Sequence, residues 1–157
     1  AMMLGRIHDR GEKITLKLSM EAKTVGDRWS RNIVSEIRGY EHPDEIVVVG
    51  GHIDSWDVGQ GAHDDGGACI ASWEALRLIK DLGLKPKRTI RCVLWTNEEN
   101  GSRGSRAYRD MHMDELDKHI VAIESDGGVF APKGFGHHQV YRRSNCSTYS
   151  FLRVIIF

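Results

Sequence analysis

The sequence predicts an α/β fold, with a mixed and largely parallel central sheet flanked by helices. Three apolar stretches rich in β-branched residues, at 46–52, 89–96 and 119–125, are typical of strands buried on both faces. Apolar residues at helical spacing fill 68–82, and 105–118 also has a helical pattern. Strands that alternate with helices pair in parallel, so these three stretches predict the centre of one sheet.

The residues before this alternation predict two further strands. The stretch 13–20, KITLKLSM, alternates apolar and polar residues, as a strand with one buried face does. The stretch 31–39 shows the same alternation. A turn is expected at 41–45, and a long loop rich in glycine and aspartate is expected at 51–67.

The helix expected at 68–82 has one apolar stripe, formed by Ile70, Trp73, Leu76 and Ile79. Gly83 is its expected C-cap. Trp73 is therefore predicted to lie in the core, and the same is expected of three residues in other apolar surroundings: Cys69, Cys92 and Trp95. His42, His112 and His119 are expected at the surface.

Composition indicates one domain and excludes some classes of partner. The 157 residues are enough to form a hydrophobic core. Basic and acidic residues balance at 22 each, so nothing indicates a surface for nucleic acid or an anionic membrane. No apolar run reaches the ~18 residues that would span a bilayer. Three cysteines without a CxxC pair indicate no disulfide framework.

Acidic residues and one histidine follow the ends of the predicted central strands. Ligands of open α/β sheets bind beyond the carboxyl ends of the strands, which meet at one edge when the strands are parallel. The residues expected at this edge are His52 and Asp54, Asp64 and Asp65, Glu98 and Glu99, and Asp126.

Histidine and carboxylates without thiolates suit a catalytic metal site, with zinc as the expected ion. A pair of ions ~3.5–4 Å apart needs a carboxylate that bridges them, and a catalytic water needs a base that is not itself a ligand. The HDDGG turn at 63–67 is a candidate source of the bridging carboxylate. Adjacent side chains at a strand end point in different directions, so Glu98 and Glu99 are expected to divide metal binding and proton transfer between them.

Three motifs carry a resemblance to a known family: GGHIDSWDVGQGAHDDGG, VLWTNEENGSRGS and IESDGG. Their order and their strand and helix contexts resemble the dizinc exopeptidases of the aminopeptidase and glutamate carboxypeptidase type. The resemblance covers roughly 1–136. It implies a three-layer zinc exopeptidase fold and hydrolysis of peptide bonds in dipeptides or short peptides, by a hydroxide that two zinc ions activate.

The resemblance also implies the metal ligands. His52 and Asp126 would hold one zinc ion. Asp64 would bridge the two ions, and Glu99 would hold the second. In the family a final histidine completes the second zinc site, and it lies beyond the region that this sequence contains.

The same resemblance implies two catalytic roles. Glu98 would be the general base that takes a proton from the water, and Asp54 would hydrogen-bond the His52 ring and fix its tautomer. Asp65 would follow the bridging residue through a strained peptide linkage.

We expect a partial catalytic domain at 1–136 and a divergent tail at 137–157, in a chain truncated at both ends. Within the tail, 149–157 is either a last strand or an exposed end. The complete protein is expected to form a homodimer. Sequons at Asn100 and Asn145, with the resemblance, favour a secreted or lysosomal protein.

Two alternatives remain open at this point. One is an inactive truncated fragment that acts at most as a binding or interaction module. The other is an enzyme of the dizinc deacylase and aminoacylase group, which shares the core fold, although the WDVGQGAHDD motif argues against it.

Overall fold

A computed structural model describes residues 2–130, 135–139 and 152–156 of the chain. Among these residues, helices and strands follow in the order α1 (Met2–Asp9), β1 (Ile33–Ile37), β2 (His42–His52), η1 (Ala62–Gly66), α2 (Gly67–Asp81), β3 (Arg88–Trp95), α3 (Arg103–Met111), η2 (Leu116–Lys118), β4 (His119–Glu124), β5 (Phe135–Gln139) and β6 (Leu152–Ile156). The described strands form one sheet with the order β1-β3-β2-β4-β6-β5.

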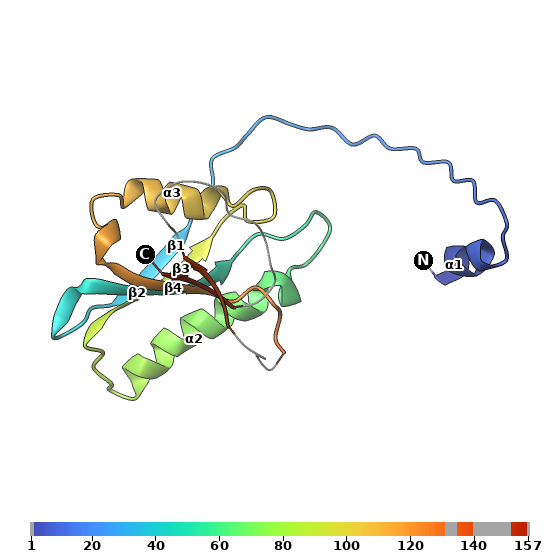
Figure 1. Ribbon diagram of the computed structural model, residues 1–157. Helices are drawn as coiled ribbons and strands as arrows, with labels where there is room; N and C mark the ends of the chain where they lie inside the picture. The colour runs from blue at the N-terminus through green and yellow to red at the C-terminus, as the bar shows by residue number, and fades with distance from the viewer. Residues whose placement is uncertain (1, 131–134, 140–151, 157) are drawn as a thin grey trace.

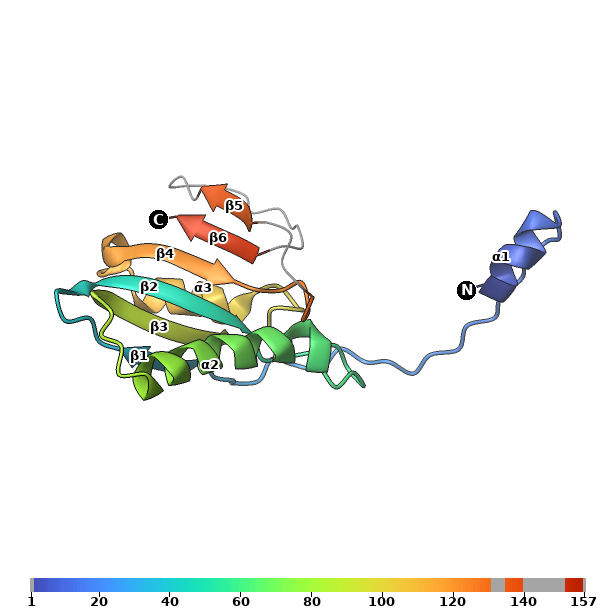
Figure 2. The same cartoon turned by 90° about the horizontal axis from the view of Figure 1, so that it is seen from below.

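The central strands are parallel, as the sequence predicts. β2 lies between β3 and β4 and pairs in parallel with both. β1 is antiparallel to β3 on one side, and β6 is antiparallel to β4 on the other. Helix α2 covers one face of the sheet and α3 covers the other (Figures 1 and 2). The result is the predicted α/β architecture with a mixed sheet between helices.

The core lies where the central strands meet α3. It consists of Ile46, Val48, Val93, Trp95, Tyr108 and Ala122. Cys69 and Cys92 are buried as expected. Strands that are covered on both faces need apolar residues at successive positions, which explains why runs rather than alternation marked β2 and β3 in the sequence.

The strand predicted at 13–20 is wrong. These residues form no regular structure, and Leu16, Leu18 and Met20 are exposed. They belong to an extended connection that leads from α1 to β1 and lies apart from the sheet (Figure 1). Alternation describes how one strand would present its faces, but a strand also needs a neighbour to bond its main chain, and alternation does not supply one.

Other boundaries differ from the expectation. The turn expected at 41–45 is the start of β2, with an irregularity in register between His42 and Ile46. The helix expected at 105–118 is divided between α3 and the short turn η2. The C-cap of α2 is Leu82 rather than the expected Gly83, which follows it with a left-handed φ of 63° and ends the helix there.

Two side-chain predictions also fail. Trp73 is 50% exposed, because α2 lies flat on the sheet and buries only a narrow stripe around Ala68, Cys69 and Leu76. His119 is 1% exposed rather than at the surface. None of the described helices is long and apolar enough to cross a bilayer.

The described part of the tail joins the sheet. β6 pairs with β4, and β5 pairs with β6 in parallel. The last strand considered at 149–157 is therefore present at 152–156. Residues 140–151, which include Cys146 and the sequon at Asn145, lie outside the described residues. The domain boundary at 136 stays a prediction.

Candidate metal centre

The carboxyl ends of β2, β3 and β4 bring the acidic residues and His52 to one edge of the sheet. His52 is the last residue of β2 and pairs with Trp95, the last residue of β3. Gly50 pairs with Glu124 at the end of β4. Because the three strands are parallel and end at the same level, the loops that carry the predicted site residues start side by side.

His52 meets two carboxylates through one ring nitrogen. Its Nε2 lies 3.1 Å from Oδ1 of Asp64 and 3.3 Å from Oδ1 of Asp126. The three residues form a group whose potential ligand atoms all lie within 4.8 Å of one another. His52 is 1% exposed, so its ring has a fixed position against the two carboxylates.

The other ring nitrogen of His52 faces Asp54. Nδ1 is 3.0 Å from the main-chain oxygen of Asp54 and 3.6 Å from its carboxylate. A carbonyl oxygen only accepts, so Nδ1 carries the hydrogen and donates it. With Nδ1 held as a donor, Nε2 is the nitrogen that would bind a metal ion beside the two aspartates once its own proton is displaced.

The Asp54 carboxylate has a second contact that the sequence did not reveal. Its Oδ1 accepts the main-chain N–H of Glu98 at 2.9 Å, and its Oδ2 accepts that of Glu99 at 3.2 Å. Asp54 therefore connects the loop after β2 with the turn after β3. The partners are more than forty residues apart, and no local pattern signals such a pair.

Asp65 supports the main chain of His52. The Asp64–Asp65 peptide bond is cis, and Asp65 is buried with its Oδ2 accepting the His52 amide hydrogen at 3.0 Å. Gly51 makes room for this contact, since a Cβ there would lie 2.3 Å from that oxygen. Burial raises the pKa of the Asp65 carboxyl to about 7, against the lowering effect of the hydrogen bond from His52.

Glu98 and Glu99 lie in a turn after β3, between two residues with left-handed backbone, Asn97 and Ser102. Ser102 Oγ donates to Oε1 of Glu98 at 3.3 Å. Glu99 has a buried Oε1 without a hydrogen-bond partner among the described residues. Burial and then the negative charge of Asp64 raise the pKa of Glu99. Glu99 is not part of the compact group formed by His52, Asp64 and Asp126.

The surroundings of His52 favour a positive charge at its ring. Burial lowers the pKa of His52, but the hydrogen bond and charge of Asp126 and the charge of Asp65 outweigh this effect and raise it to about 10. Several carboxylates thus converge on one basic nitrogen without a fixed cation among the described residues close to them. A proton or a metal ion would balance their charge.

This donor set fits a zinc ion. Zinc accepts imidazole nitrogen and carboxylate oxygen, and two ligands held ~2.1 Å from a tetrahedral ion lie ~3.4 Å apart. The separations of 3.1 and 3.3 Å from Nε2 to the two aspartates are close to this value. The buried, unpartnered oxygen of Glu99 is a further donor at the same edge of the sheet.

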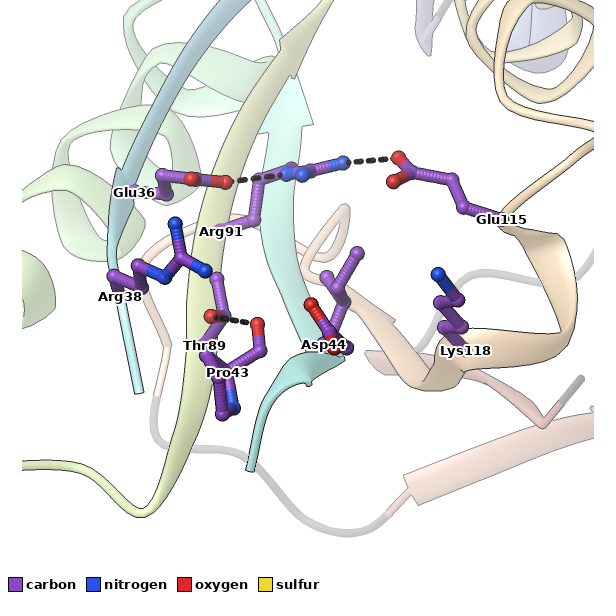
Figure 3. A pocket seen from close by; sticks show the side chains of 9 residues that line it. Glu36, Arg38, Pro43, Asp44, Thr89, Arg91, Glu115 and Lys118 are labelled. Carbon is purple, nitrogen blue, oxygen red and sulfur yellow. Dashed lines mark hydrogen bonds and ion pairs between the residues drawn. The ribbon is translucent and has the colours of Figure 1, made fainter. Parts of the chain in front are cut away.

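A charged cavity of about 150 Å³ lies at the opposite edge of the sheet, near the starts of β2 and β3. Arg91 crosses it and pairs with Glu36 at 2.9 Å and Glu115 at 3.0 Å (Figure 3). The Arg91 guanidinium also donates to the Tyr108 hydroxyl at 2.7 Å. This cavity contains none of the predicted site residues.

Tyr108 connects Arg91 to the buried His119. Nδ1 of His119 faces the Glu115 carbonyl at 3.0 Å, so it donates there, and Nε2 accepts the Tyr108 hydroxyl hydrogen at 2.9 Å. Burial lowers the pKa of His119 below its ordinary value of 6.5. The tyrosine hydroxyl thus explains how a histidine is accommodated in the core.

Comparison with known proteins identifies the family. The profile of "Peptidase family M28" matches residues 32–153. The chain is 53% identical over 134 residues to "Carboxypeptidase Q" of Rattus norvegicus and 52% identical to that of Homo sapiens, which covers 85% of this chain and 28% of each relative.

A solved structure agrees with these matches. The chain is similar to "Peptidase M28 precursor" from Shewanella amazonensis SB2B, with a TM-score of 0.57 and 49% identity over 62% of this chain and 22% of that one. The chain therefore spans less than a third of the length of these relatives. The matched residues include the whole edge described above, and the chain belongs to peptidase family M28.

Proposed function

We propose that this chain carries the metal centre and proton-transfer group of a zinc-dependent exopeptidase that hydrolyses dipeptides or short peptides. The observation that supports it best is the convergence of His52, Asp64 and Asp126 at the same sheet edge as the Glu98–Glu99 turn. Because the chain covers 28% of its relatives, the activity of a complete protein is part of the proposal.

Four residues would hold a pair of zinc ions. His52 and Asp126 would bind one ion, Asp64 would be shared, and Glu99 would bind the other. Bound zinc would polarise the peptide carbonyl and lower the pKa of a water molecule between the ions. The main-chain oxygen of Asp54 accepts the hydrogen of His52 Nδ1, so Nε2 is the ring nitrogen that would bind zinc.

Glu98 would act as the general base. It would accept a proton from the attacking water at its carboxylate and deliver that proton to the leaving amine. Two contacts orient it: the Ser102 hydroxyl at its Oε1 and the Asp54 carboxylate at its main-chain amide. Asp54 also holds the amide of Glu99, so one side chain would set both the base and a ligand in place.

The substrate class and location are proposed from the relatives. Rat and human relatives are named carboxypeptidase Q, which supports peptide substrates cleaved at a terminus. We propose a secreted or lysosomal protein that forms homodimers when complete.

The test combines metal analysis with hydrolysis of unblocked dipeptides. The complete protein is expected to retain about two zinc ions and to release free amino acids. Glu98→Gln is expected to bind zinc like wild type and to lose turnover by 100-fold or more, within the ~10²–10⁴-fold range of general acid–base catalysis. Glu21→Gln, at an exposed position in the connection between α1 and β1, is the matched control. Full turnover by Glu98→Gln would refute its assignment as the base.

A second candidate is a non-catalytic binding module of the same fold. It is favoured by one observation: the compact group of possible ligands among the described residues contains three members, without Glu99. This candidate predicts one weakly bound ion per chain and no turnover. The zinc content of the purified chain, measured together with dipeptide hydrolysis, separates the two.

A further inference from the structure

The two segments that carry Asp64 and Asp126 pack against each other just outside the metal centre. On one side are His63 and Gly67, which flank the aspartate pair, and on the other is the stretch 128–130. We call these contacts the clasp. None of its members is among the residues assigned to metal binding or catalysis.

One half of the clasp is formed by His63. Its ring lies edge-on to the ring of Phe130, with centroids 5.0 Å apart and an angle of 74° between planes. The ring also lies directly on Gly128, where a Cβ would be 2.1 Å from Nε2 of the histidine. Only a glycine lets the chain pass the imidazole this closely.

The other half joins Val129 to the start of α2. A Cβ on Gly67 would lie 2.3 Å from Cγ1 of Val129. The isopropyl group therefore fills the space above the first residue of the helix. Two glycines on opposite segments, Gly67 and Gly128, thus each receive a side chain from the other segment.

The clasp is close to both aspartates along the chain. His63 precedes Asp64 directly, and Gly128 follows Asp126 by two residues. Both carboxylates face the same Nε2 of His52 at 3.1 and 3.3 Å, so like charges are brought together there. The packed contacts thus lie within two residues of both carboxylates.

Burial alone does not account for the clasp. Phe130 is 76% exposed and Val129 is 67% exposed, so their packing removes little apolar surface from water. Contacts of this kind contribute little to the stability of the whole chain. Their effect is local, on the position of the residues that they connect.

We propose that the clasp sets the separation of Asp64 and Asp126 and so determines the affinity of the centre for its metal. Val129 and His63 are positioning residues in this proposal, acting through the aspartates next to them. The inference rests on the metal centre proposed above, and it deepens that proposal by naming what holds the centre in shape.

Gly67→Ala tests the proposal because the new Cβ would overlap Cγ1 of Val129. Val129→Ala removes that atom, and the remaining Cβ of residue 129 would lie 3.8 Å from the new methyl, an ordinary contact. The pair of substitutions should therefore fit where the single one does not. Gly127→Ala is the control in the same segment, since a Cβ there has nothing within 4 Å.

The measurement is titration of the metal-free chain with Co²⁺, followed by its visible absorption, and zinc competition with a chelator. Gly67→Ala is expected to weaken metal binding about 10- to 100-fold, the range for groups that orient ligands, and to change the Co²⁺ spectrum. Gly67→Ala with Val129→Ala is expected to recover most of the affinity and the spectrum. Thermal unfolding of the metal-free variants should stay near wild type, because alanine suits a helix better than glycine.

Wild-type affinity and spectrum in Gly67→Ala would overturn the proposal. A weakened Gly67→Ala chain that the second substitution fails to restore would overturn it as well, because the contact with Val129 would not be the cause. A wild-type chain that binds neither Co²⁺ nor zinc would overturn the metal centre itself. These results are distinguishable, so failure of the clasp and failure of the proposed function are not confused.

Discussion

Removal of the Tyr108 hydroxyl is expected to destabilise the chain. In Tyr108→Phe the ring keeps its edge contact with Trp95 and its stacking on His112. The hydroxyl no longer donates to Nε2 of His119 at 2.9 Å and no longer accepts from Arg91 at 2.7 Å. The substitution therefore removes polar contacts in a buried site with little change in volume.

The magnitude follows from these two hydrogen bonds. One of them involves a charged group, and the loss of a partner in a buried site costs about 1–3 kcal/mol. Taking about 2 kcal/mol, and a shift of ~2–4 °C per kcal/mol for a chain of this size, the Tm should fall by about 4–8 °C. Because Arg91 is also held by Glu36 and Glu115, most of the effect is expected from the His119 side.

The assay is thermal unfolding of the metal-free chain followed by circular dichroism at pH 7.5. Tyr40→Phe is the matched control, since Tyr40 is exposed and lies outside this network. Equal Tm values for Tyr108→Phe and Tyr40→Phe would show that the hydroxyl does not satisfy His119, and would refute the reasoning.

Four further results are expected. His119→Gln should reduce the loss of stability in acid. The pKa of His119 in the folded chain is lower than its ordinary value of 6.5, so the stability that neutral His119 contributes is complete above pH 6.5. This stability is lost as the pH falls from 6.5 through the folded-state pKa, at up to about 1.4 kcal/mol per pH unit. The test is the difference from wild type in urea unfolding between pH 5 and 7.5, with exposed His8→Gln as control; parallel curves would contradict it. Gly51→Ala should lower the Tm by several degrees, because its Cβ would meet the Asp65 carboxylate at 2.3 Å, whereas Gly26→Ala has open space and should be neutral in the same scan. Asp54→Asn should reduce kcat/KM for dipeptides by about 10-fold or more through the loss of one amide contact after β3, and unchanged kinetics would remove its positioning role. Zinc removal with a chelator should lower the Tm by about 5–11 °C if zinc was present at ~100 times its Kd, and an unchanged Tm would show that zinc does not bind the folded chain.

The central strands were predictable because a strand buried on both faces needs a continuous run of apolar residues, which is visible in the sequence. The runs of β-branched residues in β2, β3 and β4 identify strands, and the intervening helical pattern identifies their parallel pairing. Parallel pairing then places His52, the glutamate pair and Asp126 at one edge. That much of the candidate site followed from pattern and topology.

The predictions that failed concern residues whose environment is set by contacts with segments distant in sequence. The alternation at 13–20 has no neighbouring strand, and Trp73 points away from the narrow face that α2 buries. His119 is buried because Tyr108 and a main-chain carbonyl satisfy it. The two amide contacts of Asp54 likewise join loops after different strands, and residue type at one position does not show what lies across a sheet.

The hydrogen bonds from Glu98 and Glu99 to Asp54 also test the alignment of β2 with β3. If β3 slid along β2 by one residue, the amide of Glu98 would move ~3.3 Å and leave hydrogen-bond range of the Asp54 carboxylate. The turn after β3 would then lose its hold on the loop after β2. The metal centre can therefore assemble only when β2 and β3 are correctly aligned along their length. In a preparation of this chain, metal retention would separate molecules with a correctly paired sheet from misaligned ones that have the same secondary structure content.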